Sequence, residues 1–357
     1  MLPMRRSSFI AGLFMGLLPL IPFNSSWASA PKVVVDIAPL HSLVTQVMAG
    51  VDQPTLLVPS EASPHRYALK PSQAGALSEA DTVFWISEDL TPWLERSLDN
   101  LASSAHKVEL LERSETIRHE FRKGATFEAH DHHDENEHHD GDDEGKHHTE
   151  HDDDHHEASA HHEASAHHDE HEEKGEAGHD EHHHGQYDPH AWLDPLNAKA
   201  WANIIARELA KTDPEHADIY QANARKLNIS LDQLMDELNA RAEKLEGIHF
   251  IVFHDAYQYF ERRFGLMASG AISLSDASDP SPARIREIQN RVADWNVQCA
   301  FTEPQYNPRM LNTVFDGSVV KTTGVMDPLG VDINDPAEHY IKLLTRLMAS
   351  LEQCQSQ

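Results

Sequence analysis

Short apolar runs alternate with helical patterns along the first third of the chain. The apolar runs, rich in β-branched and aromatic residues, lie at 33–37, 55–58, 82–86 and 108–111. Helical patterns lie between and after them, at 42–48, from Pro71 onward and at 93–101. This alternation of strand and helix is typical of a parallel sheet covered by helices. We therefore predict a first α/β lobe.

Two aspartate–proline pairs predict helix starts beyond residue 190. Asp194-Pro195 places an N-cap before a proline at the first helical position, and this helix is expected to reach about residue 209. Asp213-Pro214 opens a second helix, which Gly247 ends. Its apolar positions are spaced by three, four or seven residues: Leu227, Leu231, Leu234, Leu238 and Leu245. A helix over 215–246 would be about 48 Å long, so we predict a rigid strut between two lobes.

Beyond residue 247 the alternation of strands and helices resumes. Apolar runs predict strands at 250–253, 299–302 and 319–326, and helices are expected after Ser281-Pro282 and over 337–351. The predicted fold is α/β, with two βα lobes of mostly parallel sheet joined by one long rigid helix. The predicted domains are an N-terminal lobe over 31–212, the linking helix over 213–247 and a C-terminal lobe over 248–357.

The first thirty residues predict an export signal. Arg5 and Arg6 precede an apolar run at 9–21, which is shorter than the roughly 20 residues that span a bilayer. Ala28-Ser29-Ala30 supplies a small-residue cleavage pattern, and no cysteine nearby could carry a lipid. We expect a periplasmic protein that starts at Pro31 and is not inserted in the membrane after residues 1–30 are cleaved.

The segment 130–184 does not have the composition of a folded region. It holds 19 of the 28 histidines, and its 21 acidic residues against two lysines give a formal charge of −19. It contains no aromatic residue, so it cannot bury enough apolar surface to offset the entropy of ordering. We predict a disordered insert within the N-terminal lobe.

The insert is also a predicted site of secondary metal binding, because imidazole is a favoured ligand of borderline cations such as Zn²⁺. The predicted ligands are thirteen of its paired and tripled histidines: His132, His133, His138, His139, His155, His156, His161, His162, His167, His168, His182, His183 and His184. The whole chain has a formal net charge of −30. Such a large negative charge excludes nucleic acid and anionic lipid as partners and favours the binding of cations.

Three of the nine histidines outside the insert have a distinctive context. His65 and His254 each follow a predicted strand, and His190 precedes the capped helix at Asp194-Pro195. Ligands bind open parallel sheets at the carboxyl ends of the strands. Asp327 also follows a predicted strand, and three imidazoles with one carboxylate would suit tetrahedral Zn²⁺.

The other six histidines are interpreted as ordinary residues. We expect His106, His119 and His216 at the surface, and His249 and His339 in packing roles. His41 follows the first predicted strand and is a weaker ligand candidate.

The sequence contains two cysteines, Cys299 and Cys354. In an exported chain, two cysteines and no others predict one disulfide. The alternative is a pair of free buried thiols.

Five motifs resemble those of one known family. They are Pro64-His65-x-Tyr67, His190-x-Trp192-Leu193-x-Pro195, Phe253-His254-Asp255-Ala256-Tyr257, Thr302-Glu303-Pro304-Gln305 and Asp327-Pro328-Leu329-Gly330. With the His-rich insert, they resemble the metal-specific solute-binding proteins of ABC importers, and among these the zinc receptors. The resemblance covers almost all of the chain after residue 30. It implies two α/β lobes joined by a long helix, a metal cleft between the lobes, and His65, His190 and His254 as ligands.

The same resemblance bears on the choice of metal. In manganese-binding members the third ligand is typically a carboxylate, whereas this chain has His254, which favours Zn²⁺. Some zinc receptors have a glutamate just before the first ligand histidine, where this chain has Pro64. The fourth ligand is therefore expected to be Asp327 or water. Cys299 and Cys354 match the disulfide of some zinc receptors.

The expected function is a periplasmic receptor that binds Zn²⁺ and delivers it to the membrane permease of an ABC importer. A small periplasmic zinc chaperone is a second expected partner. One alternative is a zinc hydrolase with three histidine ligands and an activated water. However, no motif places a general base, although Glu303 and Asp255 are available, so we expect no enzyme. The other alternative is a zinc buffer in which the insert does all the binding.

Overall fold

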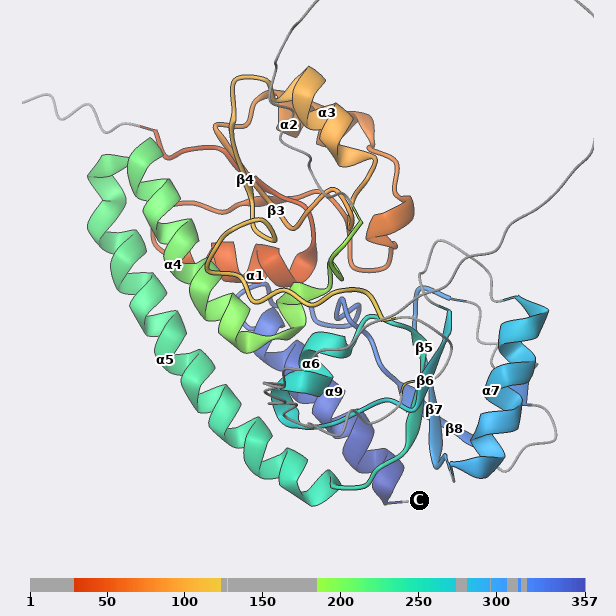
Figure 1. Cartoon of the computed structure of the whole chain (residues 1–357). Helices are drawn as coiled ribbons and strands as arrows, with labels where there is room; N and C mark the ends of the chain where they lie inside the picture. Colours follow the sequence, from red (N-terminus) through yellow and green to blue (C-terminus); the bar gives the residue numbers. More distant parts are fainter. Residues whose placement is uncertain are drawn as a thin grey trace, which may run out of the picture.

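The computed structural model describes residues 29–122, 127, 185–273, 281–295, 297–306, 314–315 and 320–356 of the 357. All of the predicted insert and all but the last two residues of the predicted signal lie outside these ranges. Two α/β lobes, each built on a parallel sheet, lie along one long helix (Figure 1). The predicted fold class is thereby confirmed.

The N-terminal lobe contains the four predicted strands. They are β1 (Val33–Val35), β2 (Thr55–Leu56), β3 (Thr82–Trp85) and β4 (His106–Glu109), all parallel in the order β2-β1-β3-β4. Alternate residues along the strands point to opposite faces of the sheet. Helix α1 (Ala38–Val47) packs on one face, and α2 (Pro71–Ser78) and α3 (Leu94–Leu101) pack on the other. The two faces of the sheet are thus covered by different helices (Figure 1). Both faces are buried, which explains the continuous apolar runs.

The C-terminal lobe has a second parallel sheet in the order β6-β5-β7-β8. Its strands are β5 (Phe250–His254), β6 (Gly270–Ser273), β7 (Cys299–Thr302) and β8 (Lys321–Val325). Its helices are α6 (Gln258–Phe264), α7 (Pro282–Asp294) and α9 (His339–Gln355). The side chain of Ser281 caps α7 as predicted, accepting a hydrogen bond from the Arg284 N–H at 3.2 Å. The sequence patterns predicted neither β6 nor α6.

The long linking helix is confirmed. Helix α5 (Ala217–Ala242) is flanked by 3-10 turns at Pro214–His216 and Glu243–Leu245, and it ends before Gly247, whose φ is 78°. It packs against α1 and α4 (Pro195–Thr212) of the N-terminal lobe and against α6 and α9 of the C-terminal lobe (Figure 1). Its leucines are buried at these contacts. One rigid helix therefore contacts both lobes.

A disulfide joins Cys299 at the start of β7 to Cys354 near the end of α9, with 5.9 Å between the Cα atoms. Both cysteines are buried. The bond fixes the last helix of the chain to the middle of the second sheet, and the predicted pairing is present. Within the ranges that the structure describes, no helix has the length and apolar character needed to cross a bilayer.

Candidate metal centre

Three predicted ligands converge from distant parts of the chain. His65 lies in the 3-10 turn Pro64–Arg66, His190 precedes the 3-10 turn Ala191–Leu193, and His254 is the last residue of β5. Ligand nitrogens of the three imidazoles all lie within 4.8 Å of one another. Among the described residues, no other group of three His, Cys, Asp or Glu side chains is placed to hold a metal ion.

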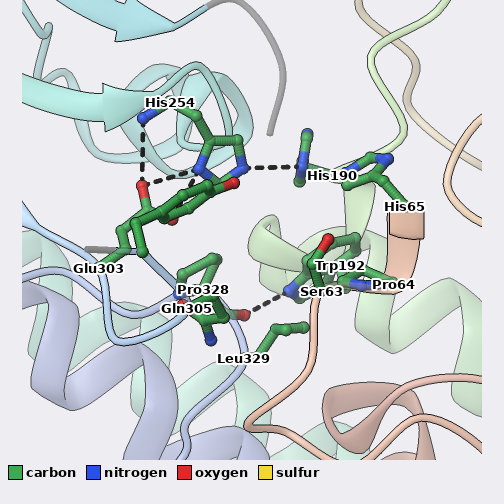
Figure 2. Close-up of a pocket in the computed structure, with 11 residues that line it drawn as sticks. Ser63, Pro64, His65, His190, Trp192, His254, Glu303, Gln305, Pro328 and Leu329 are labelled. Atoms are coloured by element: carbon green, nitrogen blue, oxygen red, sulfur yellow. Dashed lines mark hydrogen bonds and ion pairs between the residues drawn. The ribbon is translucent and has the colours of Figure 1, made fainter. Parts of the chain in front are cut away.

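The three rings face one another across a pocket where the lobes meet (Figure 2). The Nε2 atoms of His190 and His254 are 3.4 Å apart, and the rings of His65 and His190 are 5.5 Å apart between centroids. His190 and His254 are each 4% exposed, whereas His65 is partly exposed. Closely spaced imidazole nitrogens are a donor set suited to Zn²⁺, which binds nitrogen at about 2.0–2.1 Å.

Two buried carboxylates orient the histidine rings. The His190 Nδ1 atom lies 2.7 Å from Asp188 Oδ1, and the His254 Nδ1 atom lies 2.8 Å from Glu303 Oε1. A carboxylate at Nδ1 keeps the proton there and leaves Nε2 as the ligand atom. In both rings Nε2 is the atom that points into the cluster (Figure 2). We did not predict Asp188 as a site residue, although its spacing of two from His190 was a visible signal.

Burial of these carboxylates favours a cation in the pocket. Desolvation raises the pKa of Asp188 to about 7, and it also raises the pKa of Glu303. The N–H groups of His190 and His254 act in the opposite direction, because they stabilise the ionised carboxylates. A divalent cation held by the two rings would offset the remaining cost of burying these negative charges.

Tryptophan side chains position the loops of the cluster. Trp93 donates its indole N–H to the carbonyl of Pro64 at 2.6 Å, which fixes the turn that carries His65. Trp192 donates to the carbonyl of Pro328 at 2.9 Å and so connects the two lobes beside the pocket. The position of the cluster therefore depends on contacts between lobes as well as within them.

Asp327 does not belong to the histidine cluster. Its Oδ1 atom accepts hydrogen bonds from the Leu329 N–H at 3.0 Å and the Gln305 side chain at 3.1 Å, and its Oδ2 atom accepts one from the Val331 N–H at 2.6 Å. The carboxylate thus holds its own loop in shape. Its role as the fourth ligand stays a prediction.

The remaining histidines contact other groups. His41 bonds the carbonyl of Pro54, and burial lowers its pKa. His339 is buried between the carbonyls of Leu329 and Ile333, as its packing interpretation requires. The packing interpretation is wrong for His249, which is exposed directly before β5. The thirteen predicted secondary ligands lie outside the described residues.

Comparison with known proteins identifies relatives over nearly the whole chain. A family model described as the periplasmic component A of the zinc-uptake complex matches residues 33–354. The high-affinity zinc uptake system protein ZnuA of Brucella suis is 42% identical over 350 residues, which cover 98% of this chain and 97% of that protein. Its namesake in Paracoccus denitrificans is 40% identical over 327 residues, which cover 92% of each.

Solved structures agree on the fold. A crystal structure of ZnuA superposes with a TM-score of 0.64 at 21% identity, covering 91% of this chain and 98% of the other. The periplasmic zinc-binding protein TroA of Treponema pallidum has a TM-score of 0.65 at 17% identity, covering 90% and 97%. Two lobes on one long helix are therefore shared with known structures.

Proposed function

Since this chain belongs to the family of periplasmic zinc-uptake components, we propose that it captures Zn²⁺ at His65, His190 and His254. It is the zinc-binding receptor of a zinc-uptake system and not an enzyme. The partner of such a receptor is the membrane permease of an ABC importer. The convergence of three imidazoles at the meeting of the lobes carries the proposal.

The tight site is tested by titrating zinc into the full chain in competition with a chelator of known affinity. One zinc ion is expected to bind much more tightly than the rest, because the three cleft histidines already lie close together and less freedom is lost on binding. Turnover on ester substrates or CO₂ would support the hydrolase alternative. A set of uniformly weak sites would support the buffer alternative.

Asp327 is the proposed fourth ligand, with water as the alternative. Replacing Asp327 by alanine is expected to weaken zinc binding about tenfold, less than the loss of a histidine, because water can take the vacated position. Asp335→Ala is the matched control, since Asp335 also accepts a backbone hydrogen bond, from Ala337, in the same region. An unchanged dissociation constant in Asp327→Ala would identify water as the ligand.

The insert is proposed to be a secondary zinc collector. Deleting residues 130–184 is expected to lower the number of zinc ions bound and to spare the tightest one, since the three cleft histidines lie outside the deleted segment. Binding to the insert should fade as the pH falls through about 6.5, because only neutral imidazole ligates a metal.

The control is a full-length chain with asparagine at the 19 histidines of the insert, which keeps its charge of −19. We expect this chain to match the deletion in zinc stoichiometry. Loss of the tight site in either variant would mean that the insert supplies a primary ligand.

The family is periplasmic, and we propose that export proceeds through removal of residues 1–30. Mass measurement of the protein from the periplasm should then give a chain that begins at Pro31. A small periplasmic zinc chaperone remains a proposed second partner, motivated by the acidic and histidine-rich composition of the insert.

A further inference from the structure

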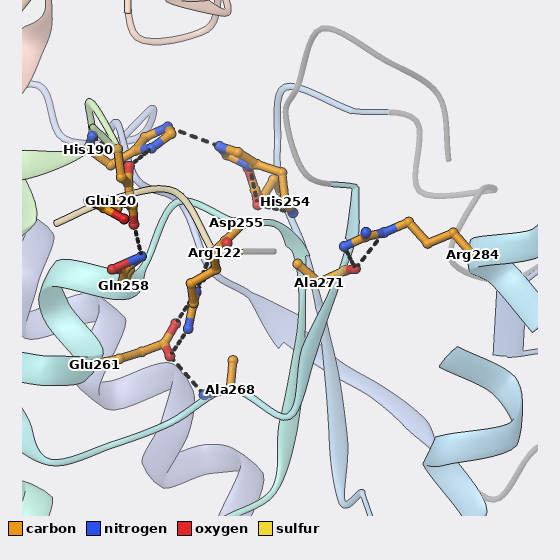
Figure 3. A network of polar contacts seen from close by, with 12 residues as sticks. Glu120, Arg122, His190, His254, Asp255, Gln258, Glu261, Ala268, Ala271 and Arg284 are labelled. Carbon is orange, nitrogen blue, oxygen red and sulfur yellow. Dashed lines mark hydrogen bonds and ion pairs between the residues drawn. The ribbon is translucent and has the colours of Figure 1, made fainter. Parts of the chain in front are cut away.

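Arg122 is a buried cation shared between two carboxylates. It lies eight residues before the insert in sequence, and it reaches into the C-terminal lobe, where its side chain is 14% exposed. Its Nε atom donates to both oxygens of Asp255 at 2.9 and 3.1 Å. Its two terminal nitrogens donate to Glu261 at 2.7 and 3.0 Å (Figure 3). The guanidinium thus makes two forked contacts, one with each acid.

The first contact lies next to a zinc ligand in sequence. Asp255 directly follows His254 at the end of β5, where the chain leaves the sheet. The Asp255 N–H donates to the carbonyl of Ser273 at 3.2 Å, and the Ala256 N–H donates back to the carbonyl of His254 at 2.9 Å. Glu303 holds the His254 ring, whereas Arg122 holds the adjacent backbone through Asp255. Together these contacts fix both the direction and the position of the imidazole.

The segment that carries Arg122 is also fixed relative to His190. The backbone N–H of His119 donates to the Tyr259 hydroxyl at 3.0 Å, and that hydroxyl donates to the carbonyl of Asp188 at 2.8 Å. Asp188 in turn holds the His190 ring. A short series of hydrogen bonds therefore connects the supports of two zinc ligands that come from different lobes.

The second contact leads away from the ligands. Glu261 lies in α6, and its Oε2 atom also accepts a hydrogen bond from the Ala268 N–H at 3.0 Å. This branch fixes the loop between α6 and β6 (Figure 3). Asp255 and Glu261 are both buried, at 5% and 2% exposure. The two acids are therefore comparable partners of Arg122. They differ in that Asp255 adjoins the ligand His254 in sequence, whereas Glu261 adjoins no ligand.

We propose that Arg122 is a positioning residue for zinc binding: through Asp255 it holds His254 at the place relative to His190 that one zinc ion requires. This inference rests on the proposed three-histidine site. A preassembled ligand set binds more tightly because less freedom is lost on binding, and supports of this kind are worth about 10–100-fold in metal affinity.

The test compares Asp255→Asn with Glu261→Gln in the full chain. Each removes one of the two negative charges that face the Arg122 guanidinium, so both should lower the unfolding temperature to a similar degree. We expect Asp255→Asn to weaken the tight zinc site about tenfold, and Glu261→Gln to leave it within about twofold of the unsubstituted protein. One equivalent of Co²⁺ should also give altered visible bands only in Asp255→Asn, because those bands report ligand geometry.

Equal zinc affinities and equal Co²⁺ spectra in the two variants would overturn the inference. Should Asp255→Asn fail to fold, Arg122→Lys gives a second route, because lysine keeps the charge but cannot make both forked contacts. It is expected to weaken zinc binding, and an unchanged affinity would count against Arg122. His254→Ala serves as the reference: if it too leaves the affinity unchanged, the proposed site itself fails, whereas a loss in His254→Ala alone refutes only the role of Arg122.

Discussion

Replacing His254 by alanine is expected to weaken the tight zinc site by more than about 100-fold, since even the outer partners of metal ligands are worth 10–100-fold. His254 is buried at the end of β5, and its Nε2 atom lies 3.4 Å from that of His190. Alanine removes a direct ligand and leaves Glu303 buried without the ring that it bonds. The affinity is measured by competition with a chelator of known strength. His65→Ala and His190→Ala should show losses of the same order.

The matched control is His216→Ala. The Nδ1 atom of His216 lies 2.7 Å from an Asp213 oxygen, the same distance as between His190 and Asp188, but His216 lies outside the cluster. Its removal should leave the tight site unchanged. If His254→Ala and His216→Ala bound zinc equally well, the assignment of the three histidines would be wrong.

Removing the disulfide is expected to lower the free energy of unfolding by about 4 kcal/mol, the chain-entropy value for a loop of this length. Cys299 and Cys354 are 55 residues apart in sequence, and both are buried between β7 and α9. The double variant Cys299→Ala/Cys354→Ala removes the cross-link that restricts the unfolded chain, so the unfolded state gains entropy. Denaturant unfolding of the two proteins measures the difference, and the midpoint should shift without loss of the tight zinc site in the folded variant.

Reductant provides the control for this prediction. Dithiothreitol should lower the unfolding midpoint of the unsubstituted protein and should not affect the double variant. Protein taken from the periplasm should resist alkylation by iodoacetamide until it is reduced. Two freely alkylated thiols in such material would contradict the bond.

The sequence by itself determined most of the secondary structure. The strands of a sheet that is buried on both faces are continuous apolar runs, so the sequence predicted β1 and β3. A helix that packs along two lobes has a regularly spaced apolar face, so the leucine spacing predicted α5. The strand β6 was not predicted, because Gly270-Ala271-Ile272-Ser273 is short and has only one large apolar residue. Helix α6 was not either, since it has only seven residues and its polar Gln258 and Glu261 are buried, so polar positions do not mark an exposed face.

The sequence also indicated which residue types could hold zinc and that they lie at strand ends or helix starts. Only the tertiary structure decided which of them meet. His65, His190 and His254 come together because the two lobes meet at one pocket, and no local pattern encodes that relation. Asp327 had an equivalent place after a strand, yet its oxygens bond the backbone of its own loop. The support of His254 by Arg122, 132 residues earlier in the chain, likewise exists only because the lobes pack together.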